Sequence, residues 1–493
     1  MARIRQVLIL LPCLLMLALA CHMFRRATIR SFFRDGPGGA APSLTQPTHP
    51  SAGMPAALRT RVVLIDGLNL TTAGQLAALN SACAQGIDVV VDNGFPSVSL
   101  PVQHVLWTGL TQHQSGVMYR IAALAVPPAG ALPAQVAGSL GIAESHNEIV
   151  NSFGFAHVMA PVPARASTPE QVAWKQQGFA AAAVTAVAGL RPLVFVHVLK
   201  VDEAGHVSGS GSEPYRRAAH EADALLGQLL AAQPDRQDTR WFVLSDHGHR
   251  KAGGHADAEP EIRFVRLCVF GGGLLPLRAR TAIHLVDVHR ALADSLAVVP
   301  HGSSAGRPWW FALSHPDAHA TLVGPGATRW TLAGSLWLTA LLLTMWLCRT
   351  CLVLWPWWGL VGGLCFVGTR GAITLSNPAV YPPLGLATAT ALAPALLMLT
   401  IQSAWALRSH APVRVVGAAL CGPLMLLCGS AVLCGAAQAT LGWQAPPPLV
   451  PIWSAVVSVV ATACTTACLA LALSLVLALL LALRAPKRDS VPS

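Results

Sequence analysis

The sequence predicts an α/β domain with a mostly parallel central sheet, preceded by an N-terminal membrane anchor and followed by a C-terminal all-α transmembrane bundle. Three short runs rich in β-branched or aromatic residues are typical of buried parallel strands, and they occupy residues 62–65, 193–199 and 241–244. Helical patterns separate these runs, at residues 71–84, 169–188 and 215–232. Alternating strands and helices indicate a parallel sheet, and the longest apolar stretches lie at the two ends of the chain.

The composition is too apolar for a wholly water-soluble protein. Of the 493 residues, 53% are hydrophobic and 11% are charged, with a mean hydropathy of +0.53. We expect a signal anchor, a linker, a polar domain, a membrane bundle and a cytoplasmic tail, at residues 1–27, 28–60, 61–327, 328–485 and 486–493. Much of the net charge of +11 is arginine beside the membrane segments, so we expect no binding to nucleic acid as a polymer.

The N-terminal segment resembles a membrane-targeting sequence. An apolar stretch at 7–24 lies between two pairs of arginines, which is typical of a signal anchor or of a cleaved signal peptide. We favour the uncleaved anchor. Residues 28–60 are rich in Pro, Gly, Ser and Ala, and this composition predicts a linker.

The predicted bundle contains about five helices, each long enough to cross about 30 Å of hydrocarbon. The spans lie near residues 330–348, 351–369, 383–407, 415–437 and 451–483. With the N-terminus in the cytoplasm, the segments that face inward carry most of the Arg and Lys of the short loops, as the positive-inside rule requires. We therefore expect a multi-pass protein of the cytoplasmic (inner) membrane, with its polar domain on the extracytoplasmic, periplasmic side.

Cysteines are scarce in the polar domain. Of the 12 in the chain, only Cys83 and Cys268 lie there. They either form a disulfide, which an oxidising compartment would allow, or are two small buried residues. We favour the second interpretation.

Aspartates follow all three predicted strands. Asp66, Asp202 and Asp246 each lie within three residues of a strand end, and ligands of such sheets bind at the carboxyl ends of the strands. A single aspartate after a strand is usually a helix cap or turn residue. Three of them, two with histidine at short spacing, indicate one shared site.

Histidines accompany these aspartates in three short motifs. D-E-A-G-H ends at His206, S-D-H-G-H contains His247 and His249, and G-G-H ends at His255. Carboxylate oxygens together with imidazole nitrogens suit two divalent cations of the zinc type. We expect His249, like His104, to support the site or the core rather than to bind a cation.

A hydroxyl suited to nucleophilic attack lies in F-P-S-V-S-L-P. Ser99 precedes a helical pattern with Pro101 early in its first turn, so its plainest role is that of a helix cap. At a helix N-terminus the hydroxyl also lies at the positive end of the dipole, where an anionic phosphate binds well. Ser97, two residues earlier, is the competing hydroxyl.

Together these motifs resemble the alkaline phosphatase superfamily of two-metal phospho- and sulfo-transfer enzymes. The similarity covers about residues 61–310. It is greatest to the type I phosphodiesterase/nucleotide pyrophosphatase group, with a second likeness to the membrane phosphoethanolamine transferases. F-P-S-V-S-L-P, D-E-A-G-H and S-D-H-G-H look like that group's nucleophile loop and ligand motifs, in the same order. The resemblance implies an alkaline-phosphatase-like α/β sandwich.

The resemblance also implies a role for each candidate residue in binding two divalent metal ions, which we expect to be zinc. The first ion would be held by Asp202, His206 and His255. The second would be held by Asp66, Asp246 and His247. Ser99 would bind beside the second ion, attack phosphorus and form a covalent phosphoserine.

The chain departs from the group's pattern at two positions. The usual nucleophile is Thr, whereas this chain has Ser99; both are hydroxyls. Arg120 stands where a phosphate-contacting Asn is usual, and it either clamps phosphate with a bidentate fork or is a solvated surface charge. Ser99 is followed by L-P-V-Q rather than x-Pro-x-Arg, which argues against a formylglycine sulfatase.

These features predict a metal-dependent phosphodiesterase/phosphatase-type hydrolase or phosphotransferase acting on phosphate esters, with phosphodiesters as the first choice. One alternative is a phosphoethanolamine-type headgroup transferase acting on a lipid or glycan. Another is a lipid-binding or transport membrane protein with a degenerate ectodomain, although the near absence of charges in the spans counts against transport. The expected partners are a phosphate-ester substrate, free or lipid-linked, and membrane lipid; the sequence does not indicate an oligomeric state.

Overall fold

The computed structural model describes residues 53–117, 123–145, 147–161, 168–234, 237–251, 253–255, 259–279, 281–300 and 302–315, together with residues 9, 11–20, 22–23, 472 and 476. Arg120, most of the predicted linker and, but for two residues, the predicted transmembrane bundle lie outside the described residues. The α/β domain belongs to the unit formed by residues 33–324 and 374–378, one of two compact units in the chain. Among the described residues, no helix has both the length and the apolarity needed to cross a membrane.

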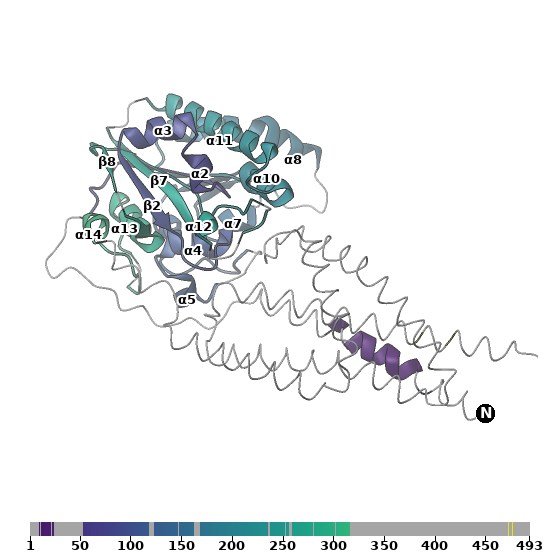
Figure 1. The fold of residues 1–493 in the computed structure, drawn as a ribbon. Helices are drawn as coiled ribbons and strands as arrows, with labels where there is room; N and C mark the ends of the chain where they lie inside the picture. The colour runs from purple at the N-terminus through teal and green to yellow at the C-terminus, as the bar shows by residue number, and fades with distance from the viewer. Residues whose placement is uncertain are drawn as a thin grey trace, which may run out of the picture. The chain divides into compact units, whose positions relative to one another are not determined.

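A mixed sheet lies at the centre of the α/β domain (Figure 1). In the described part of the chain its nine strands are β1 (Arg59–Ile65), β2 (Ile87–Asp92), β3 (Leu140–Ala143), β4 (His157–Met159), β5 (Leu193–Val198), β6 (Thr239–Leu244), β7 (Phe264–Gly271), β8 (Leu277–Arg278) and β9 (Ile283–His284). They follow the order β4-β3-β5-β1-β6-β7-β2-β8, with β9 paired to β2. Only β7 runs antiparallel to its described neighbours, so the predicted mostly parallel sheet is confirmed.

The three strands predicted from the apolar runs lie side by side. β1 pairs in parallel with β5 on one edge and with β6 on the other, so that Val63 lies opposite both Val196 and Val243. The carboxyl ends of all three strands therefore meet at the same edge of the sheet. β1 begins slightly earlier than the sequence predicts, because Arg59 already pairs with Thr239 of β6.

Helices cover both faces of the sheet (Figure 1). The described helices are α2 (Leu70–Ala73), α3 (Ala77–Ala84), α4 (Ser99–Thr108), α5 (Gln112–Ser115), α6 (Leu132–Gln135), α7 (Asn147–Asn151), α8 (Pro169–Ala173), the π-helical turn η1 (Trp174–Gly178), α9 (Phe179–Ala188), α10 (Lys200–Ser208), α11 (Glu213–Ala232), α12 (Pro260–Arg263), α13 (Leu285–Ser295) and α14 (Trp309–Ser314). One apolar core lies between the sheet and α3, α9 and α11. The other lies between the sheet and α4, α13 and α14.

Two of the predicted helices differ from the expected continuous form. The pattern at 71–84 contains two helices, because α2 ends at Gly74 and the extended backbone of Leu76 begins α3. The pattern at 169–188 is helical throughout but includes η1, where the indole of Trp174 donates a hydrogen bond to the carbonyl of Ala143 at 3.0 Å. Periodicity alone identifies both apolar faces but not these interruptions.

Cys83 of α3 and Cys268 of β7 form a disulfide. The preferred interpretation, two separate buried cysteines, is therefore wrong. Their Cα atoms are 4.8 Å apart, although 185 residues separate them in the sequence. The bond joins a helix of one face directly to the sheet.

Candidate metal centre

Three aspartates from separate strand ends meet at one edge of the sheet. Asp66 directly follows β1, Asp246 lies two residues after β6, and Asp202 lies in the first turn of α10, just after β5. All three side chains are largely buried. The backbone N–H of Gly67 donates to Asp246 Oδ1 at 3.2 Å and so ties the ends of β1 and β6 together. The strand-end positions thus bring these carboxylates into one site.

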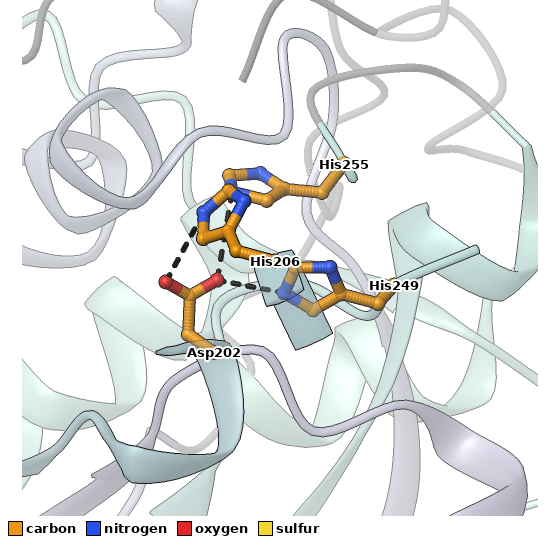
Figure 2. A group of neighbouring side chains, drawn as sticks. All are labelled: Asp202, His206, His249 and His255. Carbon is orange, nitrogen blue, oxygen red and sulfur yellow. Dashed lines mark hydrogen bonds and ion pairs between the residues drawn. The ribbon is translucent and has the colours of Figure 1, made fainter. Parts of the chain in front are cut away.

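Figure 2 shows three imidazoles around Asp202. His206 lies one turn after Asp202 on the same face of α10, with its Nε2 atom 3.3 Å from Asp202 Oδ2. His255 Nε2 lies 3.5 Å from Asp202 Oδ1 and 3.2 Å from His206 Nε2. His249 Nε2 is closer, at 2.7 Å from Asp202 Oδ1. One donor atom from each of the four residues lies within 4.8 Å of the others, so this group is able to bind a metal ion.

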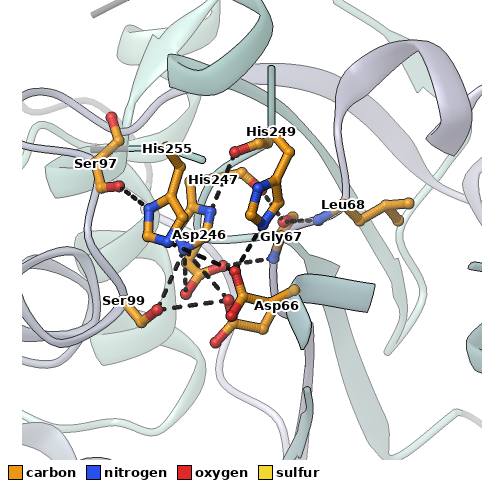
Figure 3. A network of polar contacts seen from close by, with 12 residues as sticks. Asp66, Gly67, Leu68, Ser97, Ser99, Asp246, His247, His249 and His255 are labelled. Carbon is orange, nitrogen blue, oxygen red and sulfur yellow. Dashed lines mark hydrogen bonds and ion pairs between the residues drawn. The ribbon is translucent and has the colours of Figure 1, made fainter. Parts of the chain in front are cut away.

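A second group of side chains surrounds Asp66 (Figure 3). His247 Nε2 lies 3.3 Å from Asp66 Oδ1 and 3.8 Å from Asp246 Oδ2. Ser99 Oγ lies 3.2 Å from His247 Nε2 and donates to Asp66 Oδ1 at 3.5 Å. The residues predicted for the second cation, including the candidate nucleophile, are therefore neighbours in space.

The two groups adjoin each other. The rings of His247 and His255 stack with their centroids 3.6 Å apart and an interplanar angle of 12°. Donor atoms of Asp66, Asp202 and His247 also lie within 4.8 Å of one another. The arrangement is that of one centre in which two adjoining groups of donor atoms are each able to bind a cation.

The carboxyl groups of this centre cannot all ionise easily without added positive charge. Burial, then repulsion from Asp246 and Asp202, raises the pKa of Asp66 well above its ordinary value. Burial, followed by the charge of Asp202, raises the pKa of Asp246 to about 7. For Asp202 burial acts in the same direction, but His206 and His249 outweigh it and hold its pKa well below the ordinary value. Two divalent cations would supply the missing charge, so the donor set fits them.

The imidazoles of His247, His249 and His255 are in the neutral form that metals require. Burial is the main cause that lowers the pKa of both His247 and His249 to about 4. Burial, then the charge of His247, lowers the pKa of His255 well below its ordinary value. These rings are therefore neutral at pH 7, and neutral imidazole is the metal ligand.

Ser99 and Ser97 differ in where their hydroxyls lie. Val98 is the N-cap of α4, and Ser99 is its first helical residue, so the hydroxyl of Ser99 does not cap the helix. Ser97 is fully buried, and its hydroxyl donates to the carbonyl of Gly94 at 3.2 Å. Of the two hydroxyls, only that of Ser99 contacts the predicted ligand residues; Ser97 contacts His255 through its backbone carbonyl, which accepts from His255 Nδ1 at 2.8 Å.

Sequence reasoning missed His197 and Asn93. His197, on β5, is fully buried, and its Nε2 atom lies within hydrogen-bond distance of Asp66 Oδ2, at 2.8 Å, and of Gln103 Nε2, at 3.3 Å. The side-chain amide of Asn93 donates to the carbonyl of Asp246. The available signal for His197 was a histidine inside the apolar run L-V-F-V-H-V, where a polar side chain needs a partner.

Residues 156–259 match the family model described as Type I phosphodiesterase / nucleotide pyrophosphatase. The matched segment includes five of the residues that surround the centre: Asp202, His206, Asp246, His247 and His255. This part of the chain is a type I phosphodiesterase/nucleotide pyrophosphatase domain. That family belongs to the metal-dependent hydrolases, so the predicted enzyme class is confirmed, and so is the predicted resemblance of this domain. No curated protein matches the chain.

Several solved structures are similar to about half of the chain. Murine ectonucleotide pyrophosphatase/phosphodiesterase 5 in complex with AMP is 12% identical, with a TM-score of 0.40, over 52% of this chain and 99% of that chain. A 2-O GAG sulfatase, BT1596, is 14% identical, with a TM-score of 0.41, over 53% of this chain and 75% of that one. A protein in the alkaline phosphatase superfamily from Vibrio parahaemolyticus is 14% identical, with a TM-score of 0.36, over 55% and 72%.

Proposed function

We propose that the chain is a membrane-anchored, two-metal hydrolase that cleaves phosphate esters, phosphodiesters above all, through a covalent phosphoserine. The observation that carries this proposal is the position of Ser99. Its partly exposed Oγ lies 3.2 Å from His247 Nε2 and 3.5 Å from Asp66 Oδ1, among neutral imidazoles and carboxylates. A hydroxyl in that position has the surroundings of a metal-activated nucleophile.

Zinc is the proposed metal, because the donors are carboxylate oxygens and imidazole nitrogens in similar numbers. One ion would be held by Asp202, His206 and His255. The other would be held by Asp66, Asp246 and His247, with Ser99 beside it. When bound, the two ions would stabilise the charge on the entering and leaving oxygens of an in-line displacement. Arg120, outside the described residues, stays a predicted phosphate contact.

In the proposed reaction Ser99 gives up its proton, and its Oγ forms a bond to phosphorus. The bond between phosphorus and the leaving alcohol breaks, and that alcohol takes up a proton. Water then attacks phosphorus, the bond to Oγ breaks, and Ser99 regains a proton. Because Ser99 is the first residue of the ten-residue α4, the positive end of the helix dipole faces the phosphate and stabilises it.

A transferase uses the same first step. If a hydroxyl of a lipid or glycan replaces water in the second step, the product is a phosphodiester rather than free phosphate ester. The apolar spans predicted at 328–485 favour this alternative, because they would hold the domain beside lipid-linked acceptors. The assembled donor set counts against a degenerate ectodomain, the premise of the lipid-transport alternative.

For the membrane placement we propose a multi-pass protein of the cytoplasmic membrane with its catalytic domain outside the cytoplasm. The Arg and Lys bias of the predicted loops supports it. Reporter fusions after residues 60 and 310 should then be active on the outer side, and a fusion after residue 488 on the cytoplasmic side. A cytoplasmic signal from the fusion after residue 310 would contradict the topology.

The nucleophile is tested with the full-length protein in detergent, on aryl phosphomonoesters, phosphodiesters and sulfates. Ser99→Ala should abolish turnover, by about 10⁴-fold or more, while it keeps bound zinc nearly intact, because three protein ligands of the second ion remain. Ser97→Ala is the matched control and should be mild, since that hydroxyl faces Gly94. Mass spectrometry of an acid-quenched reaction should find phosphate on Ser99. Near-normal turnover of Ser99→Ala would show that another group attacks phosphorus.

A further inference from the structure

Two buried imidazoles contact the ligand carboxylates of the centre without belonging to the predicted ligand set. His197 Nε2 lies 2.8 Å from Asp66 Oδ2, and His249 Nε2 lies 2.7 Å from Asp202 Oδ1. Both side chains are fully buried. Each of the two proposed cation sites thus contains one aspartate with a histidine partner of its own.

The spacing of donor atoms separates these two histidines from the predicted ligands. Two atoms that each lie about 2.1 Å from a tetrahedral zinc ion are about 3.4 Å apart. The pair His206–Asp202 is 3.3 Å apart, His255–Asp202 3.5 Å, and His247–Asp66 3.3 Å.

The contacts of His197 and His249 are shorter, at 2.8 and 2.7 Å. That is the length of a hydrogen bond from a nitrogen to a carboxylate. Donor atoms of Asp66, His197 and Asp246 also lie within 4.8 Å of one another, as do those of the group that contains His249. The short contacts nevertheless favour hydrogen bonding of these two imidazoles to the carboxylates over metal ligation.

Each contact leaves the other oxygen of the carboxylate facing a predicted ligand, although His255 lies 3.5 Å from the same oxygen of Asp202 that His249 contacts. His197 binds Oδ2 of Asp66, whose Oδ1 is 3.3 Å from His247 Nε2 and accepts from Ser99. His249 binds Oδ1 of Asp202, whose Oδ2 is 3.3 Å from His206 Nε2. A carboxylate held in this way cannot rotate away from its ion.

The fold holds both imidazoles in place. The ring of His197 stacks on Phe195, at 5.8 Å between centroids and 21° between planes. The ring of His249 packs beside Gly205 in α10, where an added Cβ would lie 2.4 Å from His249 Cδ2. Ser210 donates to the carbonyl of His249 at 2.9 Å and fixes its backbone.

We propose that His197 and His249 are positioning residues, each donating its Nε2–H to one ligand carboxylate and so orienting that carboxylate toward its own cation. The proposal rests on the two-metal site of the proposed function. It assigns one orienting imidazole to each site. Substitution of His197 should therefore weaken the binding of one cation, and substitution of His249 the binding of the other. Loss of such a partner typically weakens metal binding by about 10- to 100-fold.

The test is an equilibrium titration of metal-free, full-length protein in detergent with Co²⁺ alone, against a competing chelator, with the visible absorption of Co²⁺ recorded. His249→Leu and His197→Leu fill the space but lack the donor, whereas His249→Gln and His197→Gln keep an N–H donor. Each Leu variant should lower the affinity for one of the two Co²⁺ ions by about 10- to 100-fold. Each Gln variant should stay within about threefold of wild type and keep its absorption spectrum. Asp202→Ala and Asp246→Ala identify which ion is lost.

The outcomes separate this proposal from the function on which it rests. If the wild-type chain binds fewer than two Co²⁺ ions, the two-metal function fails, and the proposal fails with it. If wild type binds two and the Leu variants bind them equally well, only the positioning role is contradicted. If a Gln variant changes the absorption bands as much as the Leu variant does, the imidazole is a ligand, and the positioning role is also contradicted.

Discussion

Lowering the pH from 7 to 5 should weaken zinc binding at the Ser99 site far more than it would weaken binding at a site whose aspartates have ordinary pKa values. Burial and the charge of Asp202 raise the pKa of Asp246 from 3.8 to about 7 in the metal-free domain. Below that pH the carboxyl group is protonated, and the proton must leave before a cation binds. Metal affinity at this site therefore falls as the pH decreases through about 7.

The size of the loss in zinc affinity follows from the pKa shift of Asp246. For one proton with a pKa of about 7, affinity falls about 50-fold between pH 7 and pH 5, whereas a pKa of 3.8 gives about 1.1-fold. Asp66, whose pKa is also raised, adds to the effect. Asp202 does not, because its pKa is lowered and it is ionised throughout this range.

Calorimetric titration of the metal-free protein with zinc, in two buffers of different ionisation enthalpy, counts the protons released. About 0.9 proton should leave Asp246 at pH 6 and about 0.1 at pH 8. Ser97→Ala is the control, because its hydroxyl faces the carbonyl of Gly94 and the substitution keeps both carboxyl groups, so it should show the same pH dependence as wild type. An affinity that is unchanged between pH 5 and 8 would refute the reasoning.

Three further outcomes concern stability. In the metal-free protein, folding raises the pKa of Asp246 to about 7, so between about pH 4 and 7 the folded protein binds this proton more tightly than the unfolded chain does. The contribution of Asp246 to the free energy of unfolding therefore falls as the pH rises through this range. The difference in free energy of unfolding between wild type and Asp246→Asn, from urea denaturation at several pH values, measures this contribution. Arg307→Ala should cost about 3–5 kcal/mol in the same assay, because it leaves Asp287 charged and buried without its partner 2.6 Å away; a loss below 1 kcal/mol would contradict this. Breaking the Cys83–Cys268 disulfide with a reductant should cost about 2–5 kcal/mol, and unchanged stability after confirmed reduction would exclude the bond as a stabilising element.

The parts of the fold that the sequence predicts are those whose signal is local. β-Branched runs identify β1, β5 and β6, and parallel pairing forces their carboxyl ends to one edge. The sequence alone therefore suffices to place Asp66, Asp202 and Asp246 together. The break between α2 and α3 is not readable from the periodicity, because it depends on Gly74, which ends α2, and on the extended backbone of Leu76, which begins α3.

The disulfide shows a different limit. Two cysteines in an α/β domain are equally consistent with a bond and with separate burial, and only the packing of α3 over β7 brings these two within 4.8 Å between Cα atoms. The redox state of the compartment also decides whether such a bond forms. A disulfide persists outside the cytoplasm, so the bond is compatible with the proposed periplasmic placement of the domain.

The proposed ligand residues and the residues proposed to orient them differ in their spacing along the sequence. The proposed metal ligands Asp202 and His206 lie in one motif, D-E-A-G-H, because one helical turn brings them together. The partner of a ligand has no such constraint: His197 is 131 residues from Asp66, and His249 is 47 residues from Asp202. His197 is recognisable only once the sheet has placed Asp66 beside it, whereas His249 lies in S-D-H-G-H and is already expected from the sequence to support the site or the core. Substituting a ligand removes a donor atom and also changes the geometry of the site. Substituting His197 or His249 changes the orientation of a carboxylate but leaves every proposed donor atom in place, so it tests the effect of geometry alone.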